Sequence, residues 1–449
     1  PALICTSCNE SVLDPQVARI AAKRFGEAGA GVWWSDPVER YLPPGFACER
    51  CGGSSFEKEK NIVDIWFESG VTHLAVLGKD GMPWPSDLVL EGGDQYRGWF
   101  RSSLLTAVAT EGRAPYRRVV KNGWVNDEQG RAMSKSLGTG IDAREAMNRW
   151  GADVLRLWAA SVEFVDDVRF GPNVVDQVGR VYRNIRNRIR FMLSNLDDLE
   201  ASDVVAVERM RPFDRLACSV ADAFASGVRD DYHAFDIHGA YLRVVEFESS
   251  MSGLYFDALK DPLYSRAMQD PRRRSAQSAL LHVLERLLTA IAPVLSFTAE
   301  EAWQALPERL RGGAESVFDT SLFATHAKAE ARAADAELWQ ILRDLRARAA
   351  SGDGPRDFEA RARIVAPPTL HARLLGLGDE LREAMVVSQL ELEMAPREEG
   401  GGVAAVELTP ALGEKCARCW KYRRLGDDPE HPSICAECAQ VVRALDAAR

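Results

Sequence analysis

A lysine between two serines is the first set of residues that could do chemistry. Ser134, Lys135 and Ser136 lie in the stretch GRAMSKSLGTG, residues 130–140, which has glycines close on both sides. A lysine ammonium is a mobile point charge that can follow negative charge as it develops on a phosphate. Glycines let the backbone approach a ligand closely. The stretch is a candidate phosphate-binding loop, although a bare SKS motif is more often a solvated surface loop.

A second set of polar residues surrounds two glycines in LVLEGGDQYRGWF, residues 88–100. Glu91, Asp94 and Gln95 offer acceptors and donors for an amine and for ribose hydroxyls. Gly92 and Gly93 permit a close approach of the backbone to a ligand. Taken alone, the segment is equally typical of a polar turn between a strand and a helix.

Eight of the nine cysteines occur as four CxxC pairs, and the chain opens without a secretion signal pattern. This combination favours zinc thiolates over disulfides. The last two pairs have a spacing suited to one tetrahedral zinc, whose four protein ligands leave no open position and make its role structural. These ligands are Cys416, Cys419, Cys435 and Cys438. The first two pairs form either a second site or two half-sites that pack elsewhere, and they are Cys5, Cys8, Cys48 and Cys51.

The net charge of −10 argues against a generally basic nucleic-acid-binding protein but leaves room for a local basic face. One helical segment interleaves apolar residues with arginines that could contact RNA phosphates or pair within the protein. These arginines are Arg180, Arg183, Arg186 and Arg190. The last cysteine cluster carries a mixture of aromatic and basic groups suited to base stacking and phosphate contact. They are Trp420, Lys421, Tyr422, Arg423 and Arg424.

The elements that must position these residues change type along the chain. NIVDIWF (61–67) and DLVLE (87–91) are predicted strands, and the second is followed by a turn and the helical segment 97–110. This order is typical of a parallel α/β layer with ligands at the carboxyl ends of its strands. After Asp142, a plausible N-cap, the apolar period becomes helical and predicts a helix bundle.

These motifs together resemble the class I aminoacyl-tRNA synthetases. AMSKS resembles the KMSKS signature, and DIWFESGVTH and LEGGDQYRGWF resemble two blocks typical of the isoleucyl-tRNA synthetase family. GADVLRLWAAS, DVRFGP and RNIRNRIRFMLSNL resemble that family's connection into its anticodon-binding bundle, and CARCW…CAEC resembles its terminal zinc knuckle. Valyl and leucyl relatives share the loop, whereas the GGDQYRGWF block and the knuckle favour the isoleucyl family. The resemblance covers essentially the whole chain.

The resemblance implies a role for each matching residue. Lys135 is implied to stabilise the β- and γ-phosphates of ATP as pyrophosphate leaves, and ATP is implied to bind together with Mg²⁺. Ser134 and Ser136 flank this lysine and are implied to belong to the same ATP-binding loop. The residues implied to contact ATP or the aminoacyl-adenylate in the other block are Glu91, Gly92, Asp94 and Gln95. Trp66 and Trp99 match aromatic walls of the amino-acid pocket, although plain core packing explains a tryptophan equally well.

Two departures from the family pattern shape the expected fold. Ala132 stands where the first lysine of the signature is expected, and none of the seven histidines forms a His-x-Gly-His signature. The inserted editing domain is not recognisable either. We therefore expect a multidomain α/β plus α chain that corresponds to the C-terminal half of the enzyme. The expected segments are a zinc-knuckle insertion (1–60), the second half of a Rossmann-like catalytic domain (61–172), a helical anticodon-binding bundle (173–354), a small mixed α/β segment (355–410) and a C-terminal zinc knuckle (411–449).

The resemblance implies an isoleucine–tRNA ligase that acts on isoleucine, ATP and tRNA(Ile) together with the N-terminal half of the synthetase. It implies a cytoplasmic protein that binds no membrane and is monomeric when complete, with structural Zn²⁺. Two alternatives stay open at this point. In the first, the chain is a tRNA-binding module without catalysis, because half of the active site is missing. In the second, it belongs to a synthetase of valyl-type specificity.

Overall fold

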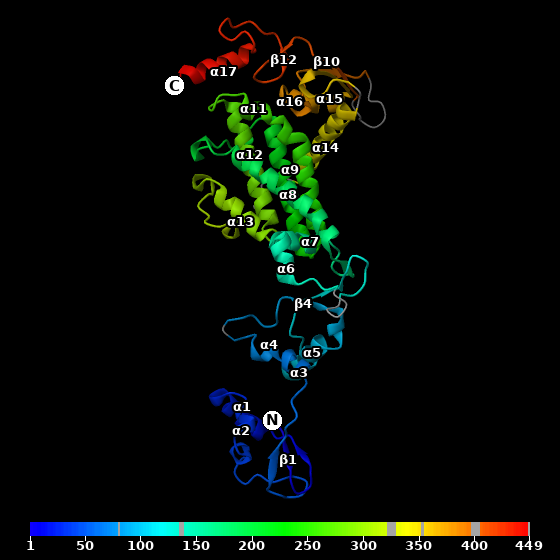
Figure 1. The fold of residues 1–449 in the computed structure, drawn as a ribbon, viewed down its shortest axis with the longest axis vertical. Helices are drawn as coiled ribbons and strands as arrows, with labels where there is room; N and C mark the ends of the chain where they lie inside the picture. Colours follow the sequence, from blue (N-terminus) through cyan, green and yellow to red (C-terminus); the bar gives the residue numbers. More distant parts are fainter. Residues whose placement is uncertain (80, 134–138, 321–328, 352–353, 397–404, 448–449) are drawn as a thin grey trace. The chain divides into compact units, whose positions relative to one another are not determined.

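The computed structural model describes residues 1–79, 81–133, 139–320, 329–351, 354–396 and 405–447. The chain divides into two compact units, Pro1–Asn122 and Gly123–Arg449, and each has its own buried hydrophobic cluster. In Figure 1 the first unit runs from blue into cyan, and the second runs on to red.

The first unit begins with a small antiparallel sheet that carries the first cysteine cluster. Its strands have the order β2-β1-β3, with bounds β1 Leu3–Cys5, β2 Ser11–Val12 and β3 Phe56–Lys58. Helix α1 (Pro15–Ala28) starts where the Asp14 side chain accepts hydrogen bonds from two backbone N–H groups, and α2 (Val32–Ser35) follows. Trp33, Tyr41 and Phe56 are buried in the core, so this sheet and its helices have an apolar interior of their own.

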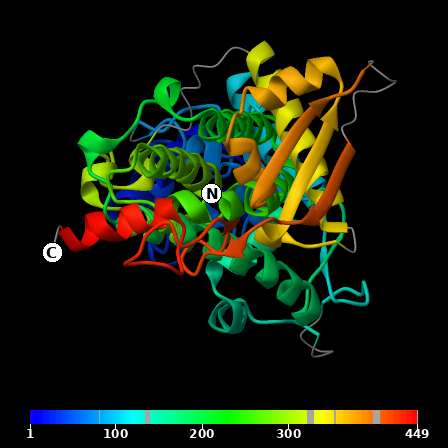
Figure 2. The ribbon, with the colours of Figure 1, turned by 90° about the horizontal axis from the view of Figure 1, so that it is seen from above.

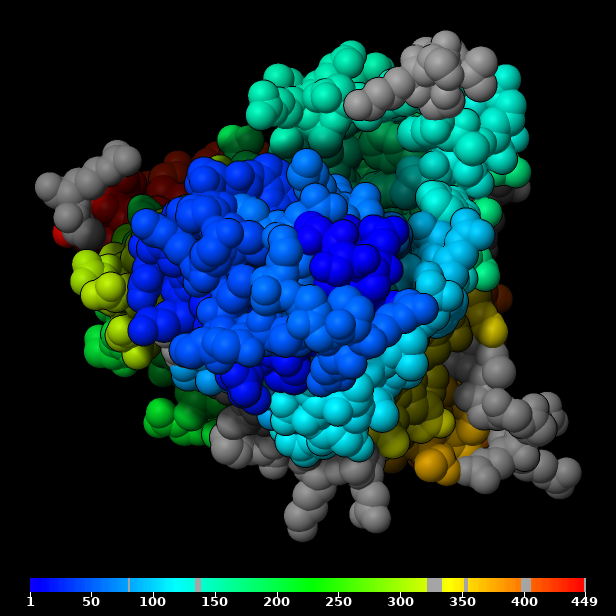
Figure 3. All heavy atoms as spheres, turned by 90° about the horizontal axis from the view of Figure 1, so that it is seen from below, coloured from blue at the N-terminus to red at the C-terminus, as the bar shows by residue number. Residues whose placement is uncertain are grey.

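A parallel pair of strands forms the second part of the first unit. Strands β4 (Val89–Gly92) and β5 (Val119–Asn122) pair in parallel, and α5 (Trp99–Glu111) connects them. The short helices α3 (Ile65–Gly70) and α4 (Thr72–Ala75) precede them. The expected α/β layer is confirmed. Figure 3 shows one face of the first unit, whose atoms run from dark blue into cyan.

One strand prediction in this part is wrong. The segment 61–67 was expected as a strand, but α3 begins at Ile65 because the Asp64 side chain accepts a hydrogen bond from the Trp66 backbone N–H at 2.7 Å. Gly70 then lets α3 pack tightly against α5, since a Cβ at that position would lie 2.7 Å from the Cβ of Ser102. The second half of segment 61–67 therefore belongs to helix α3, which packs against α5 beside strands β4 and β5.

The second unit opens with a second parallel pair, β6 (Val125–Asn126) and β7 (Val168–Arg169). Between them in sequence lie α6 (Ala143–Trp150) and α7 (Ala152–Ala160). The expected N-cap at Asp142 is confirmed, because its side chain accepts hydrogen bonds from the N–H groups of Arg144 and Glu145.

A helix bundle forms the main body of the second unit, as expected. Its helices are α8 (Pro172–Ser194), α9 (Pro212–Ala234), α10 (Ile237–Ser250), a π-helical turn (Met251–Phe256), α11 (Lys260–Tyr264), α12 (Pro271–Ile291), α13 (Ser296–Ala305) and α14 (Ala329–Ser351). Val178, Ile185 and Ile189 of α8 are buried, which agrees with the helical period of the sequence. None of the helices in the described residues is long and apolar enough to cross a membrane.

A three-stranded sheet and a cysteine knuckle complete the second unit. The sheet has the order β10-β8-β9, with β8 (Ala360–Ala366) parallel to β9 (Gln389–Met394) and antiparallel to β10 (Ala405–Pro410). Helices α15 (Pro368–Leu375) and α16 (Glu380–Met385) connect β8 to β9. Figure 2 shows this sheet in yellow and orange beside the yellow helix α14. The knuckle contains β11 (Glu414–Lys415), β12 (Tyr422–Arg423) and α17 (Ala436–Ala447).

Candidate functional site

The polar block of residues 91–95 lies at the carboxyl end of strand β4. Glu91 and Gly92 end the strand, and Asp94 and Gln95 belong to the single 3₁₀ turn Gly93–Tyr96 that follows it. The Gln95 amide donates to Oδ2 of Asp94 at 3.2 Å. A Cβ at Gly92 would lie 2.7 Å from Oδ1 of Asp94, so a larger residue at this position would require the exposed Asp94 carboxylate to move. The structure thus gathers these four residues at the end of a parallel strand, where open α/β sheets bind ligands.

Trp66 and Trp99 lie next to the same block. Oε1 of Gln95 accepts a hydrogen bond from the Trp99 backbone N–H at 3.2 Å, and the Trp99 indole N–H donates to the Ser69 carbonyl at 3.0 Å. The Trp66 ring lies against Gly98, where an added Cβ would be 3.4 Å from its Cδ2. Trp66 stays 42% exposed. Two aromatic rings therefore stand beside the polar block, and one of them is open to a ligand.

The lysine loop is only partly within the described residues. Ser134, Lys135 and Ser136 lie outside them, whereas the turn before the loop is well defined. The Asp127 carboxylate accepts hydrogen bonds from the backbone N–H groups of Gln129 and Arg131 and from the Arg131 guanidinium. These donors hold the pKa of Asp127 below its usual value. Sequence reasoning missed Asp127, although its place before Gln129 and Gly130 is typical of an Asx turn.

The last four cysteines form one compact cluster in the second unit. Their Sγ atoms all lie within 4.8 Å of one another, and those of Cys419 and Cys435 are 3.9 Å apart. A tetrahedral zinc with Zn–S bonds of about 2.3 Å requires sulfur atoms roughly 3.8 Å apart. The Cys435 backbone N–H also donates to Sγ of Cys416 at 3.3 Å, a contact that favours a thiolate. The donor set fits a structural zinc ion.

The first four cysteines also form a single cluster rather than two separate half-sites. Sγ of Cys5 lies 3.6 Å from that of Cys51, and Sγ of Cys8 lies 3.7 Å from that of Cys48. All four sulfur atoms are within 4.8 Å of one another. The geometry fits a second tetrahedral zinc ion, although these two CxxC pairs are far apart in sequence.

The predicted arginine face of α8 is only partly free. Arg180, Arg183 and Arg190 are exposed, and none of them has an ion-pair partner in the part of the chain that the structure describes. Arg186 instead forms two hydrogen bonds with the Glu301 carboxylate, at 2.6 and 3.0 Å. Its guanidinium is therefore already engaged within the protein.

The basic residues of the terminal knuckle also differ in their availability. Trp420 is 62% exposed, and the Arg424 side chain is 88% exposed with Asp427 as its partner at 3.2 Å. Arg423 pairs with Glu437 at 2.8 Å. Lys421 is buried, with its Nζ 2.5 Å from Oδ2 of Asp261, so its ammonium does not face solvent.

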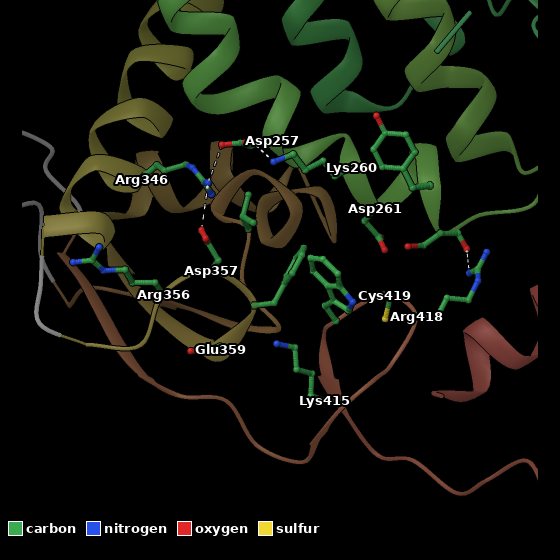
Figure 4. A pocket seen from close by; sticks show the side chains of 15 residues that line it. Asp257, Lys260, Asp261, Arg346, Arg356, Asp357, Glu359, Lys415, Arg418 and Cys419 are labelled. Carbon is green, nitrogen blue, oxygen red and sulfur yellow. Dashed lines mark hydrogen bonds and ion pairs between the residues drawn. The ribbon is translucent and has the colours of Figure 1, made fainter. Parts of the chain in front are cut away.

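A cavity of 560 Å³ lies within the second unit, lined by residues of α11, of α14, of the segment before β8 and of the knuckle. Figure 4 shows charged side chains of both signs around it. Arg346 lies between Asp257 and Asp357, at 3.7 and 3.6 Å. Trp420 and Cys419 line the cavity from the knuckle, and Asp261 lines it from α11. Burial raises the pKa of the Asp261 carboxyl, but the positive charges of Lys421, Arg266 and Arg382 together outweigh this effect, and the pKa lies below its usual value.

Three family descriptions match the chain in succession. They are tRNA synthetases class I (I, L, M and V) over residues 1–171, the anticodon-binding domain of tRNA ligase over residues 214–353, and the zinc finger found in FPG and IleRS over residues 413–441. The third description places the last cysteine cluster within a known zinc-binding module.

Curated relatives are similar to the chain along almost all of its length. An isoleucine–tRNA ligase of Desulfovibrio desulfuricans is 39% identical over 468 residues, which cover 99% of this chain and 50% of the relative. One of Symbiobacterium thermophilum is 37% identical, again over 99% of this chain and 50% of the relative. The chain spans about half the length of the curated relatives it matches.

A solved structure is similar in fold. The LeuRS of Agrobacterium radiobacter K84, in a ternary complex with tRNA and LeuAMS, matches with a TM-score of 0.50 and 16% sequence identity. The match covers 82% of this chain and 42% of that chain. At this identity the likeness concerns the fold alone.

Proposed function

We propose, for a chain that belongs to the class I aminoacyl-tRNA synthetase family, that it forms the C-terminal part of a cytoplasmic isoleucine–tRNA ligase. The observation that carries the proposal is the similarity to isoleucine–tRNA ligases over 99% of the chain. In this proposal residues 1–60 form a zinc-knuckle insertion, 61–172 belong to the catalytic domain, 173–354 form the anticodon-binding bundle, 355–410 form a small mixed segment and 411–449 form the terminal knuckle.

The proposed reaction has two steps. An oxygen of the isoleucine carboxylate attacks the α-phosphate of ATP, the bond to the β-phosphate breaks, and isoleucyl-adenylate and pyrophosphate form. A hydroxyl of the terminal ribose of tRNA(Ile) then attacks the adenylate carbonyl, which releases AMP. Mg²⁺ bound with ATP would neutralise part of the phosphate charge. No covalent enzyme intermediate is required, so the protein's task is to position the reactants and to stabilise charge.

Each site residue has a proposed part in this chemistry. Lys135, between Ser134 and Ser136, stabilises the β- and γ-phosphates as pyrophosphate leaves. Trp66 and Trp99 form walls of the pocket for the branched aliphatic side chain. The residues proposed to contact the adenylate are Glu91, Gly92, Asp94 and Gln95.

The same proposal requires the rest of the catalytic fold. Parallel sheets are normally covered on both faces, yet the first unit leaves large apolar side chains exposed around its two parallel strands. Ile62 is 82% exposed, Ile65 71% and Leu105 63%. We propose that the N-terminal half of the synthetase covers this surface and that the completed enzyme is a monomer.

Isoleucine-dependent exchange of labelled pyrophosphate into ATP tests the proposal. We expect no exchange by this chain alone, and exchange when it is mixed with a protein that carries the remaining half of the fold. Valine in place of isoleucine, measured in the same mixture, tests valyl-type specificity. Exchange that requires valine would contradict the isoleucine assignment. Absence of exchange in a mixture that forms a stable complex would leave only the binding role.

The exposed arginines of α8 favour a tRNA-binding role for the bundle whether or not catalysis is restored. We expect Arg183→Ala to weaken tRNA(Ile) binding and to reduce the salt dependence of binding by about one phosphate contact. The matched control is Arg188→Ala, because Arg188 pairs with Glu248 at 2.9 Å. Filter-binding titrations at several salt concentrations measure both quantities. Equal losses in the two variants would contradict a specific phosphate contact at Arg183.

A further inference from the structure

A buried lysine connects the terminal knuckle to the helix bundle. The Lys421 side chain is 1% exposed, and its Nζ lies 2.5 Å from Oδ2 of Asp261, whose side chain is 5% exposed. Asp261 belongs to α11, so the ion pair joins two segments that are far apart in sequence. The guanidinium of Arg266 lies 3.4 Å from the same carboxylate. The Phe358 ring, with its centroid 5.9 Å from Nζ, packs against the lysine.

The two residues before Lys421 line the cavity. Cys419 belongs to the thiol cluster, and Trp420 follows it with φ of 62°, in the left-handed region that is unfavourable for a bulky side chain. Such a conformation persists only where the surroundings determine it. Here the chain is held on both sides, by the cysteine cluster before Trp420 and by the ion pair after it. The Trp420 backbone N–H also donates to the Cys416 carbonyl at 2.9 Å.

Stability alone does not explain a lysine at this position. Removing an ammonium and a carboxylate from water is unfavourable, and apolar residues of similar volume often replace a buried ion pair without loss of stability. An apolar residue cannot supply an attraction directed at one particular partner. The ion pair can therefore determine which way the knuckle faces the bundle. The orientation of the knuckle in turn determines where the Trp420 side chain lies. This side chain is 62% exposed and contributes little to the core.

Other contacts keep the knuckle attached. The Arg418 guanidinium donates to the Ser265 carbonyl at 2.5 Å, and the Tyr422 backbone N–H donates to Oγ of Ser388 at 2.7 Å. Figure 4 shows Arg418 and Asp261 on the same side of the cavity as Cys419. Loss of the lysine charge would leave these contacts in place and leave Asp261 with Arg266. The knuckle would then stay bound while its orientation relaxes.

We infer that Lys421 is a positioning residue, which holds the knuckle on the bundle through Asp261 so that the Trp420 side chain is presented at the cavity. The inference rests on the proposed function in one respect, since tRNA(Ile) is taken as the molecule that this surface meets. Lys421 itself is not expected to touch the RNA, because its ammonium is enclosed by protein.

Hydrogen exchange on the full chain tests the inference without RNA. In Lys421→Met we expect several-fold faster amide exchange in segments 257–266 and 414–424, with an unchanged zinc content. Asp261→Asn alters no residue of the knuckle and should produce the same pattern. Wild-type exchange rates in both variants would overturn the inference.

The binding of tRNA(Ile) tests the functional consequence. We expect Lys421→Met and Trp420→Ala each to weaken binding about 10-fold. The double variant should bind no worse than Trp420→Ala alone, because both substitutions remove the same contact, that of Trp420 with the RNA. The control is Arg443→Met, which should leave binding unchanged. This substitution breaks an ion pair inside the knuckle, between Arg443 and Asp428, whose nitrogen and oxygen atoms are 2.8 Å apart. Multiplied losses in the double variant would overturn the positioning role. If the wild-type chain binds no tRNA, the proposed RNA contact fails, and hydrogen exchange still decides the role of Lys421.

Discussion

We expect that replacing Lys135 with alanine lowers isoleucine-dependent pyrophosphate exchange about 10²-fold in the proposed assembled enzyme. One well-placed charge in a preorganised site contributes roughly 3 kcal/mol to stabilisation of the transition state. Lys135 is the only lysine in residues 130–140, and Ala132 occupies the position where the family signature has another. No neighbouring ammonium in the loop can therefore replace it. Because the proposed role of this charge is to act on the departing phosphates, we expect the loss to fall on kcat more than on the KM for isoleucine.

A matched control separates this effect from a general loss of positive charge. Lys23 lies exposed on α1, and Lys23→Ala makes the same change in net charge away from the polar block of residues 91–95. We expect wild-type exchange in that variant. Lys135→Arg keeps the charge but replaces a compact ammonium with a planar guanidinium, so it should restore only part of the rate. Full activity in Lys135→Ala would mean that other groups neutralise the leaving pyrophosphate.

Much of the fold could be predicted because its signals are local. The strand over DLVLE and the helical period of α8 depend on residues that are neighbours in sequence. The cysteine clusters were also predictable, because a CxxC pair supplies two ligands whatever the rest of the fold. The wrong strand at 61–67 is instructive. An apolar run suggested a strand, but the carboxylate of Asp64 caps a helix inside that run, and capping by one residue decided the outcome.

The parts of the site that sequence reasoning missed depend on distant partners. Lys421 reads as one more basic residue in CWKYRR, and only the fold brings Asp261 to it. Arg186 likewise has the spacing of a phosphate-binding face but pairs with Glu301. Whether a charged side chain is free or engaged is a property of the tertiary structure. The pattern could therefore indicate the basic surfaces but not which of their residues remain available.

The second large effect is expected at Cys419. Serine at this position removes one zinc ligand, and we expect the terminal knuckle to unfold and the chain to lose one bound zinc ion. Among the described residues, the hydrophobic cluster of the knuckle consists of its four cysteines, with only Leu425 and Ile434 packed partly against them. Its two strands have two residues each. With so little apolar interior, the free energy of zinc binding, about 10–16 kcal/mol in zinc-finger peptides, is effectively the folding free energy.

Cys51→Ser makes the matched change in the first cluster and should have a milder effect. That cluster adjoins an apolar core with Trp33, Tyr41 and Phe56, so the surrounding sheet and helix keep other support. Zinc analysis should give one ion fewer in each variant, while limited proteolysis should cut residues 411–449 only in Cys419→Ser. Because the knuckle carries Trp420, the proposed tRNA contact, we expect Cys419→Ser also to weaken tRNA binding without affecting pyrophosphate exchange, which requires no tRNA. Protease resistance of 411–449 without its zinc would instead mean that docking contacts such as Lys421–Asp261 hold the knuckle together, and that the metal is secondary to them.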